Sequence, residues 1–173
     1  MKDHVIGVYI GTTGTKTGIY DVEGRLVGEA FEESVLHYPR PAEAIFRSVL
    51  NTVSAAMARA RLAPDRIAAI ALDGQMAGIM AIDQDWRPVT HYDSWLDTRC
   101  APFLEQLRPH ENDIIQTCGM ALAFNHAPKI LYWRDRPDVW KRIASFIQPA
   151  AYPAVRPAGM EVRDADKART LPL

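Results

Sequence analysis

The chain has 173 residues, of which 48% are hydrophobic and 24% are charged, and its formal net charge is −1 at neutral pH. This balance is typical of a soluble globular protein with one sizeable core. It gives no electrostatic reason to bind nucleic acid or an acidic membrane, and no apolar run approaches the ~20 residues that span a bilayer. Cys100 and Cys118 lack metal-ligand spacing, and the N-terminus has no signal-peptide pattern. We therefore predict free thiols and a cytoplasmic protein.

Three successive antiparallel strands are predicted at the start of the chain. Residues 4–10 are mostly apolar and β-branched, residues 16–22 form a second run, and residues 25–36 form a third. The connections are short: a turn at Gly11–Gly14 and a Glu23-Gly24 hairpin signal. Short connections of this kind join antiparallel neighbours.

A helix should follow the Tyr38-Pro39-Arg40-Pro41 break and end at Ala63-Pro64-Asp65. Its apolar stripe recurs every three or four residues, at Ile45, Val49, Val53, Met57 and Ala60. After this crossover, residues 67–72 predict a buried strand parallel to an earlier one. Further strands are expected at residues 79–82 and 89–95, separated by turns.

Beyond Trp95 the pattern becomes helical. We expect a helix capped by Asp97 or Thr98 and running to about Leu107, and then a helix over residues 111–118 that stops at Gly119. Residues 127–134 and a segment starting at Pro137 predict two more, before a last strand at 146–148.

The sequence predicts one domain over residues 1–152 and an irregular tail over residues 153–173. The tail contains three prolines and mixed charges, and it leaves no periodic face to bury. We expect it to be extended or disordered, the alternatives being an edge helix or a packed arm.

The Gly11–Gly14 turn is the first candidate site. Its glycines allow the backbone to present N–H groups to an anion, while threonine hydroxyls and a lysine add donors suited to phosphate. The spacing is not that of a Walker A loop, and a strand follows in place of a helix. Taken alone, such a turn is more often only a turn.

Two further stretches carry polar and aromatic groups. Gln75 and Met76 lie between glycines, where they would line a small polar pocket or merely close a hairpin. Trp95, Asp97 and Arg99 combine an aromatic platform with a carboxylate and a guanidinium, which suits a sugar, although a helix cap with a salt bridge explains them equally well. The five histidines show no ligand spacing, so no metal site is predicted from them.

In this order, the motifs resemble the FGGY family of carbohydrate kinases, particularly its xylulokinase-like and gluconokinase-like members. The resemblance runs from about Val5 to Tyr152. It also includes Ala127-Pro128-Lys129-Ile130-Leu131 with Trp133, and residues 147–152. It implies an α/β fold of the actin-like, ribonuclease-H-like type, here as an incomplete N-terminal domain with a mixed sheet and helices.

The resemblance also implies ATP-dependent phosphoryl transfer to a sugar hydroxyl, with Mg²⁺ as the metal cofactor. The phosphate motif would be carried by Gly11, Thr12, Thr13 and Lys16. The sugar pocket would be lined by Gln75, Met76, Trp95, Asp97 and Arg99.

Several departures from the family pattern bear on activity. Tyr9 stands where the family has the aspartate of its Mg²⁺–phosphate site, and a neutral phenol cannot replace a hard anionic ligand. A Trp, Glu and Gln-Asp-Pro stretch before the first helix is missing, and Ala77 replaces a frequent histidine. The family's catalytic-base aspartate, adenosine motifs and second domain would lie beyond Leu173, and the tail after Tyr152 is expected no longer to follow the family.

We therefore expect a truncated, catalytically impaired kinase that has no catalytic residue of its own and a doubtful Mg²⁺ site. Its partners would be a small sugar and ATP, without nucleic acid or membrane. The alternatives are a non-catalytic module that binds a sugar or a partner, and a non-functional remnant whose exposed apolar edges cause self-association.

Overall fold

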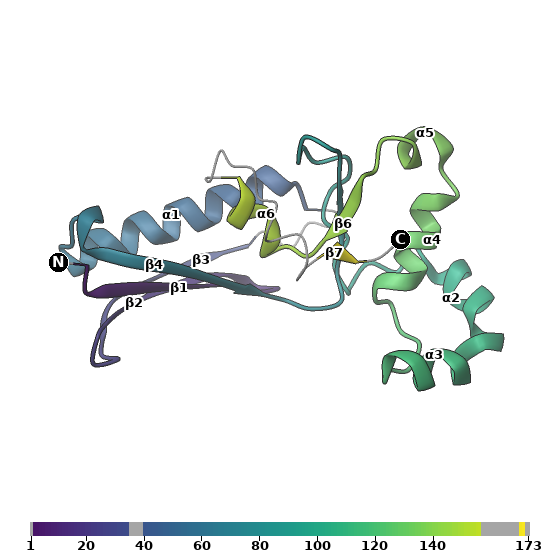
Figure 1. Cartoon of the computed structure of the whole chain (residues 1–173), viewed down its shortest axis with the longest axis horizontal. Coiled ribbons are helices and arrows are strands. Elements are labelled where there is room, and N and C mark those ends of the chain that lie inside the picture. Colours follow the sequence, from purple (N-terminus) through teal and green to yellow (C-terminus); the bar gives the residue numbers. More distant parts are fainter. Residues whose placement is uncertain (1, 35–39, 157–169, 172–173) are drawn as a thin grey trace. The chain divides into compact units, whose positions relative to one another are not determined.

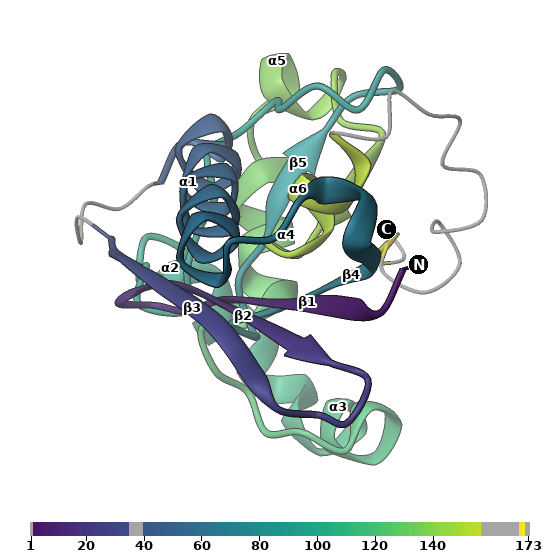
Figure 2. The same ribbon diagram turned by 90° about the vertical axis from the view of Figure 1, so that its left-hand side faces the viewer.

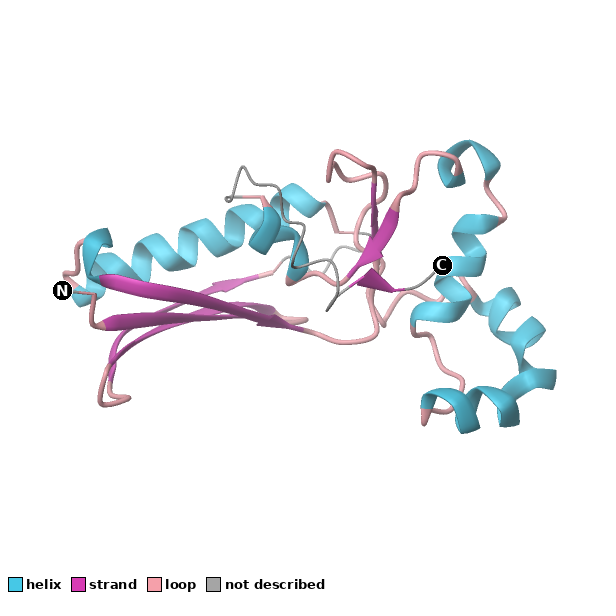
Figure 3. Ribbon diagram, in the orientation of Figure 1, coloured by secondary structure: helices cyan, strands magenta, loops and turns pink. Residues whose placement is uncertain are grey.

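The computed structural model describes residues 2–34, 40–156 and 170–171. These residues form two compact units, and each is described by itself. The first contains residues 2–34, 41–75 and 149–156, and the second contains residue 40, residues 76–148 and residues 170–171. Figure 3 shows that the chain mixes helices and strands, as the α/β prediction requires.

A four-stranded sheet forms the frame of the first unit. Its strand order is β3-β2-β1-β4, and the strands are β1 (His4–Ile10), β2 (Gly14–Asp21), β3 (Leu26–Glu33) and β4 (Ile67–Gly74). β1 and β3 each pair antiparallel with β2, whereas β4 runs parallel to β1. The predicted strand directions are confirmed (Figure 2), whereas the predicted burial of residues 67–72 is wrong, because the residues of β4 are exposed or only partly buried. The third strand ends at Glu33, because Ser34 is described and lies outside it, and residues 35–39 of the chain lie outside the described residues.

Helix α1 (Ala42–Ala60) packs on one face of this sheet (Figure 1). Ile45 and Val49 are buried as predicted, whereas Val53 and Met57 are only partly buried. After the second turn of α1, the buried face of the helix is therefore made of other residues than the predicted ones. The small residues Ser48, Thr52 and Ala56 continue it in place of the predicted apolar ones.

Hydroxyl pairs between β2 and α1 explain this shift. Thr15 Oγ1 and Ser48 Oγ are 2.8 Å apart, and Thr17 Oγ1 donates to Thr52 Oγ1 at 2.8 Å. A buried hydroxyl without a partner is costly, so the two threonines of the strand require polar partners on the helix. The two threonines point to the same face of β2, and their hydrogen bonds determine which residues of α1 face the sheet.

A hydrogen bond joins the start of α1 to α6 (Ala151–Val155), which lies more than one hundred residues later. The Tyr152 hydroxyl donates to Glu43 Oε1 at 2.5 Å, while its ring is almost fully buried. Burial and this carboxylate raise the pKa of Tyr152 to about 12. α6 includes Pro153, which is the first residue of the predicted irregular tail. Residues 157–169 of that tail lie outside the described residues. The predicted domain boundary stays a prediction.

Replacing Tyr152 with phenylalanine should lower the free energy of unfolding by about 1 kcal/mol, because Glu43 is half exposed and regains water. Denaturant titration at neutral pH measures this change. Tyr20→Phe is the matched control, because Tyr20 is an exposed tyrosine on the sheet of the same unit. Equal effects of the two variants would contradict the proposed role of the bond.

The second unit has a small antiparallel sheet of order β5-β6-β7, in which the strands are β5 (Met80–Ile82), β6 (Ser145–Ile147) and β7 (Thr170–Leu171). Ile79, Ala81 and Phe146 form its buried core. Its helices are α2 (Ala101–Leu107), α3 (Glu111–Cys118), α4 (His126–Arg134) and α5 (Pro137–Trp140). Gly119, with φ of 69°, ends α3 as predicted.

Two predictions fail in this unit for local reasons. Residues 89–95 form isolated bridges and no strand, because Thr90 Oγ1 accepts the Ala81 N–H and interrupts the ladder. Neither Asp97 nor Thr98 caps α2, which begins after Cys100. The Asp97 carboxylate instead accepts the backbone N–H of Arg99 at 3.0 Å, which closes a tight turn.

Within the described part of the chain, every helix is too short or too polar to cross a membrane.

Candidate functional site

The Gly11–Gly14 turn is held against the end of β4 in the first unit. The backbone N–H of Gly11 donates to Gly14 O at 2.8 Å, and the Gln75 N–H donates to Ile10 O at 2.9 Å. The Gln75 side chain makes two longer contacts, from Nε2 to Gly11 O at 3.4 Å and from Thr12 Oγ1 to Oε1 at 3.3 Å. Three predicted site residues, Gly11, Thr12 and Gln75, are therefore close together.

Tyr9 lies beside this turn, and its ring covers Gly11. A Cβ placed on Gly11 would be 2.9 Å from Tyr9 Cε1. Tyr9 pairs in register with Asp73 on β4 and with Lys16 on β2, so the three side chains form a row on the sheet face opposite α1. Tyr9 is 51% exposed, so the phenol can move.

Lys16 faces away from the turn, on the open sheet face. Its Nζ lies 3.2 Å from Glu29 Oε2, and both side chains are more than half exposed. Lys16 also lines a shallow hollow of about 310 Å³ with Tyr9, Tyr20 and Asp73. Thr13 contributes its backbone carbonyl, which accepts the Ser34 N–H at 2.8 Å.

The residues around this turn do not fit a magnesium ion. Mg²⁺ prefers oxygen ligands, above all carboxylates, and the aromatic ring of Tyr9 occupies the position next to Gly11. Among the described residues, no three His, Cys, Asp or Glu side chains gather closely enough to hold a metal ion. The hydroxyls and small residues of the turn remain suited to phosphate oxygens.

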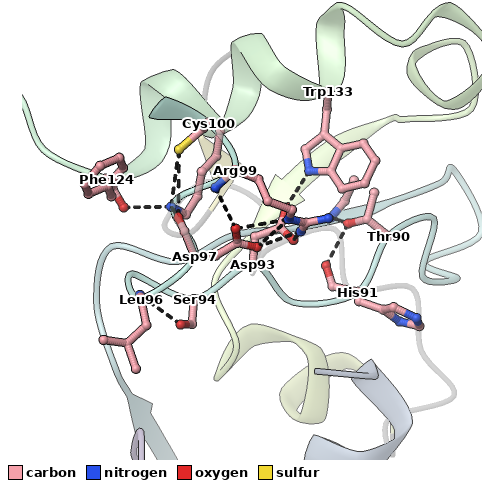
Figure 4. A network of polar contacts seen from close by, with 12 residues as sticks. Thr90, His91, Asp93, Ser94, Leu96, Asp97, Arg99, Cys100, Phe124 and Trp133 are labelled. Carbon is pink, nitrogen blue, oxygen red and sulfur yellow. Dashed lines mark hydrogen bonds and ion pairs between the residues drawn. The ribbon is translucent and has the colours of Figure 1, made fainter. Parts of the chain in front are cut away.

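Two of the residues predicted for the sugar pocket, Asp97 and Arg99, lie together in the second unit (Figure 4). Arg99 Nε donates to both Asp97 oxygens at 3.0 and 2.9 Å, and Arg99 Nη2 donates to Asp97 Oδ2 at 2.7 Å. The predicted aromatic and thioether groups, Trp95 and Met76, are 48% and 78% exposed. Asp97 and Arg99 are thus fixed to each other, while the other two are open to solvent.

Asp93 joins this cluster, and the sequence did not predict it. Its side chain is 3% exposed, and it accepts hydrogen bonds from Arg99 Nη2 and Trp133 Nε1, each at 2.5 Å. Burial raises its pKa to about 6, against the opposing effects of Trp133 and Arg99. Because the folded state favours the protonated acid, this group stabilises the fold most at low pH, and the contribution is lost as the pH rises toward 6.

Lys129 is a second buried charge next to the cluster. Its Nζ donates to Phe124 O at 2.8 Å and to Asp97 O at 3.0 Å, and it lies 3.7 Å from Cys100 Sγ. These contacts fasten α4 to the 97–100 turn. Burial raises the pKa of the Cys100 thiol, so the sulfur is protonated at neutral pH and structural.

Comparison with known proteins gives one consistent result. The model of the N-terminal domain of the FGGY family of carbohydrate kinases matches residues 4–169. The similarity therefore continues past Tyr152, and the expectation that it ends there is wrong. Glycerol kinase of Trichormus variabilis is 29% identical over 142 residues, which are 76% of this chain and 28% of that enzyme. Glycerol kinase of Agrobacterium fabrum is 31% identical over 115 residues, 62% of this chain and 23% of the enzyme.

Solved structures show the same fold. Xylulose kinase from Bifidobacterium adolescentis superposes with a TM-score of 0.77 at 21% identity, over 95% of this chain and 36% of that chain. Gluconate kinase from Lactobacillus acidophilus superposes with a TM-score of 0.77 at 20% identity, over 88% of this chain and 32% of that chain. The chain thus spans about a quarter to a third of the length of the relatives that it matches.

Proposed function

Because this chain belongs to the FGGY family of carbohydrate kinases, with an actin-like α/β fold, we propose that it is the sugar-binding N-terminal part of an ATP-dependent carbohydrate kinase. We propose further that this polypeptide alone does not transfer phosphate. The residues assigned to the sugar are Gln75, Met76, Trp95, Asp97 and Arg99, and those assigned to the nucleotide phosphates are Gly11, Thr12, Thr13 and Lys16.

The position of Tyr9 is the observation that carries the second half of this proposal. Kinases of the family use ATP and Mg²⁺, and phosphoryl transfer depends on a cation that neutralises the developing charge. Here a phenol covers Gly11, where an anionic ligand would be needed. What the chain supplies is the binding and orientation of a polyhydroxylated ligand.

Binding and turnover separate the two halves of the proposal. Calorimetric titration with glycerol, xylulose and gluconate measures binding, and a coupled assay of ADP release measures phosphoryl transfer. We expect saturable binding of at least one ligand without sugar-dependent ADP release. Clear turnover by this chain would overturn the claim of impairment, and the absence of all binding would overturn the assignment of a sugar site.

Trp95→Leu should weaken sugar binding about tenfold, because it removes the aromatic surface on which a sugar ring stacks. Leu96→Ala is the matched control, because Leu96 is a neighbouring exposed side chain outside the proposed site. Titration of both variants with the tightest ligand decides the point. If Leu96→Ala weakens binding as much as Trp95→Leu, the ring has no specific role.

We propose self-association as a second property, supported by β4. Within the described residues β4 pairs only with β1, and Ile70 on this strand is 53% exposed. An apolar cleft of about 600 Å³, lined by Val53, Met57 and Ile67, lies beside it. An open apolar strand edge favours pairing with another chain. Light scattering after size-exclusion chromatography tests this, and a monomer at high concentration would contradict it.

A further inference from the structure

The Arg99 guanidinium has two edges at which it can hold a carboxylate, and the first is already occupied. Arg99 Nε and Nη2 both donate to Asp97, with a shortest distance of 2.7 Å. This is the side edge of the guanidinium, and it uses the Nη2 hydrogen that lies on the Nε side. The Asp97 side chain is 8% exposed, so its carboxylate is shielded from water.

Asp93 occupies half of the second edge, at the end of the guanidinium. The remaining Nη2 hydrogen is directed to Asp93 Oδ1 at 2.5 Å. The other oxygen, Oδ2, accepts the Trp133 indole N–H, and the Asp93 backbone pairs with Ile79 at 2.8 and 3.0 Å. With its main chain and both oxygens held, this buried carboxylate cannot turn away (Figure 4).

Of the three guanidinium nitrogens of Arg99, only Nη1 has no hydrogen-bond partner among the described residues. The Arg99 side chain is 40% exposed. The rings of Tyr132 and Trp133 lie 5.3 and 5.9 Å from the guanidinium carbon and fix its plane. A carboxylate binds arginine strongly when it takes one hydrogen from each of two nitrogens. Nη1 alone can donate to hydroxyl or carbonyl oxygens but cannot form such a fork.

The charges around the cluster balance. The groups that face Asp93 are Arg99 and Asp97 from its own loop and Lys129 and the neutral Trp133 from α4. Two carboxylates and two cations sum to zero, so the cluster offers no net positive charge to an anion.

We propose that Asp93 is a specificity-determining residue: by holding the end of the Arg99 guanidinium, it makes this site accept neutral polyols and ketoses and reject aldonates. This inference rests on the proposed function, in which residues 95–99 face the sugar. Loss of the Asp93 charge frees the Nη1–Nη2 edge for a carboxylate.

Acid has the same effect as removing the charge. The pKa of Asp93 is raised to about 6, so its carboxylate is ionised at pH 7.5 and mostly protonated at pH 5. A protonated Asp93 can still accept the Trp133 N–H, but it holds Arg99 less strongly. Gluconate stays ionised at pH 5, because a free α-carboxyl titrates at about 3.5.

Asp93→Asn tests the inference, with Asp138→Asn as the matched control because Asp138 is an exposed residue of α5 that pairs with Lys141. At pH 7.5 we expect the wild type and the control to bind xylulose or glycerol about tenfold more tightly than gluconate, as measured by calorimetry. Asp93→Asn should remove or reverse this preference. An unchanged ratio in Asp93→Asn would overturn the inference.

A second measurement does not require a sugar to bind. The Trp133 indole N–H resonance, assigned through Trp133→Phe, reports on this edge, and formate serves as a minimal carboxylate. We expect formate to shift the resonance saturably in Asp93→Asn at pH 7.5 and in the wild type at pH 5, with an affinity about tenfold higher than in the wild type at pH 7.5.

The two measurements fail in distinguishable ways. If no sugar binds, the proposed function fails, and formate still decides whether Asp93 closes the edge. A wild-type resonance that responds to formate equally at both pH values would overturn the inference, and this test remains available if Asp93→Asn does not fold.

Discussion

Replacing Tyr9 with aspartate should give the chain a magnesium-dependent affinity for nucleotide, at least about tenfold above that of the wild type. The substitution removes the ring that covers Gly11 and places a carboxylate at that position. Tyr9 pairs in register with Asp73, so the new carboxylate would lie beside an existing one. Two neighbouring carboxylates repel each other and are stabilised by a divalent cation.

Thermal unfolding with and without Mg²⁺ is the first measurement. Without the ion, Tyr9→Asp should unfold at a lower temperature than the wild type, because two like charges are close together. Mg²⁺ should restore the unfolding temperature only in this variant. Titration with ADP at fixed ionic strength, in Mg²⁺ and in EDTA, then measures the gain in nucleotide affinity.

Tyr20→Asp is the control for a charge placed elsewhere on the same sheet. Tyr20 lies on the same open face but away from the turn, and it is 39% exposed. It should gain no magnesium dependence. Equal gains in both variants, or tight Mg²⁺–ADP binding by the wild type, would show that Tyr9 does not limit this site.

The frame of the first unit could be predicted because its signals are local. Short turns and β-branched runs define β1, β2 and β3, and the crossover helix makes β4 parallel to β1. The inward face of α1 was predicted less well beyond Val49. The apolar periodicity of the helix sequence does not show that Thr15 and Thr17 on β2 need hydroxyl partners on α1.

The site was predicted unevenly for a similar reason. Asp97 and Arg99 are two residues apart and bind each other, so their pairing could be read from the sequence as a salt bridge. Asp93 carries no motif signal of its own between Tyr92 and Ser94, and its partner Trp133 is 40 residues away. No periodicity or spacing rule links these two residues, and only the packing of α4 brings them together.

Replacing Gly78 with alanine should be among the most destabilising single changes in the second unit, at about 3 kcal/mol. A Cβ on Gly78 would overlap the Tyr92 hydroxyl, and even ring atom Cε2 would be only 2.6 Å away. Tyr92 is fully buried, so its ring cannot swing into solvent. The backbone of Tyr92 is also held by a bridge to Arg40. The clash must therefore be relieved by moving packed main chain.

Gly7→Ala is the matched control, because no atom lies within 4 Å of a Cβ placed on Gly7 in β1. In an open strand position alanine should be neutral or stabilise by up to about 0.5 kcal/mol, since it restricts the unfolded chain. Thermal unfolding should show a decrease of roughly 10 °C for Gly78→Ala and almost no change for Gly7→Ala. If Gly78→Ala unfolds at the wild-type temperature, the Tyr92 ring does not pack closely against Gly78.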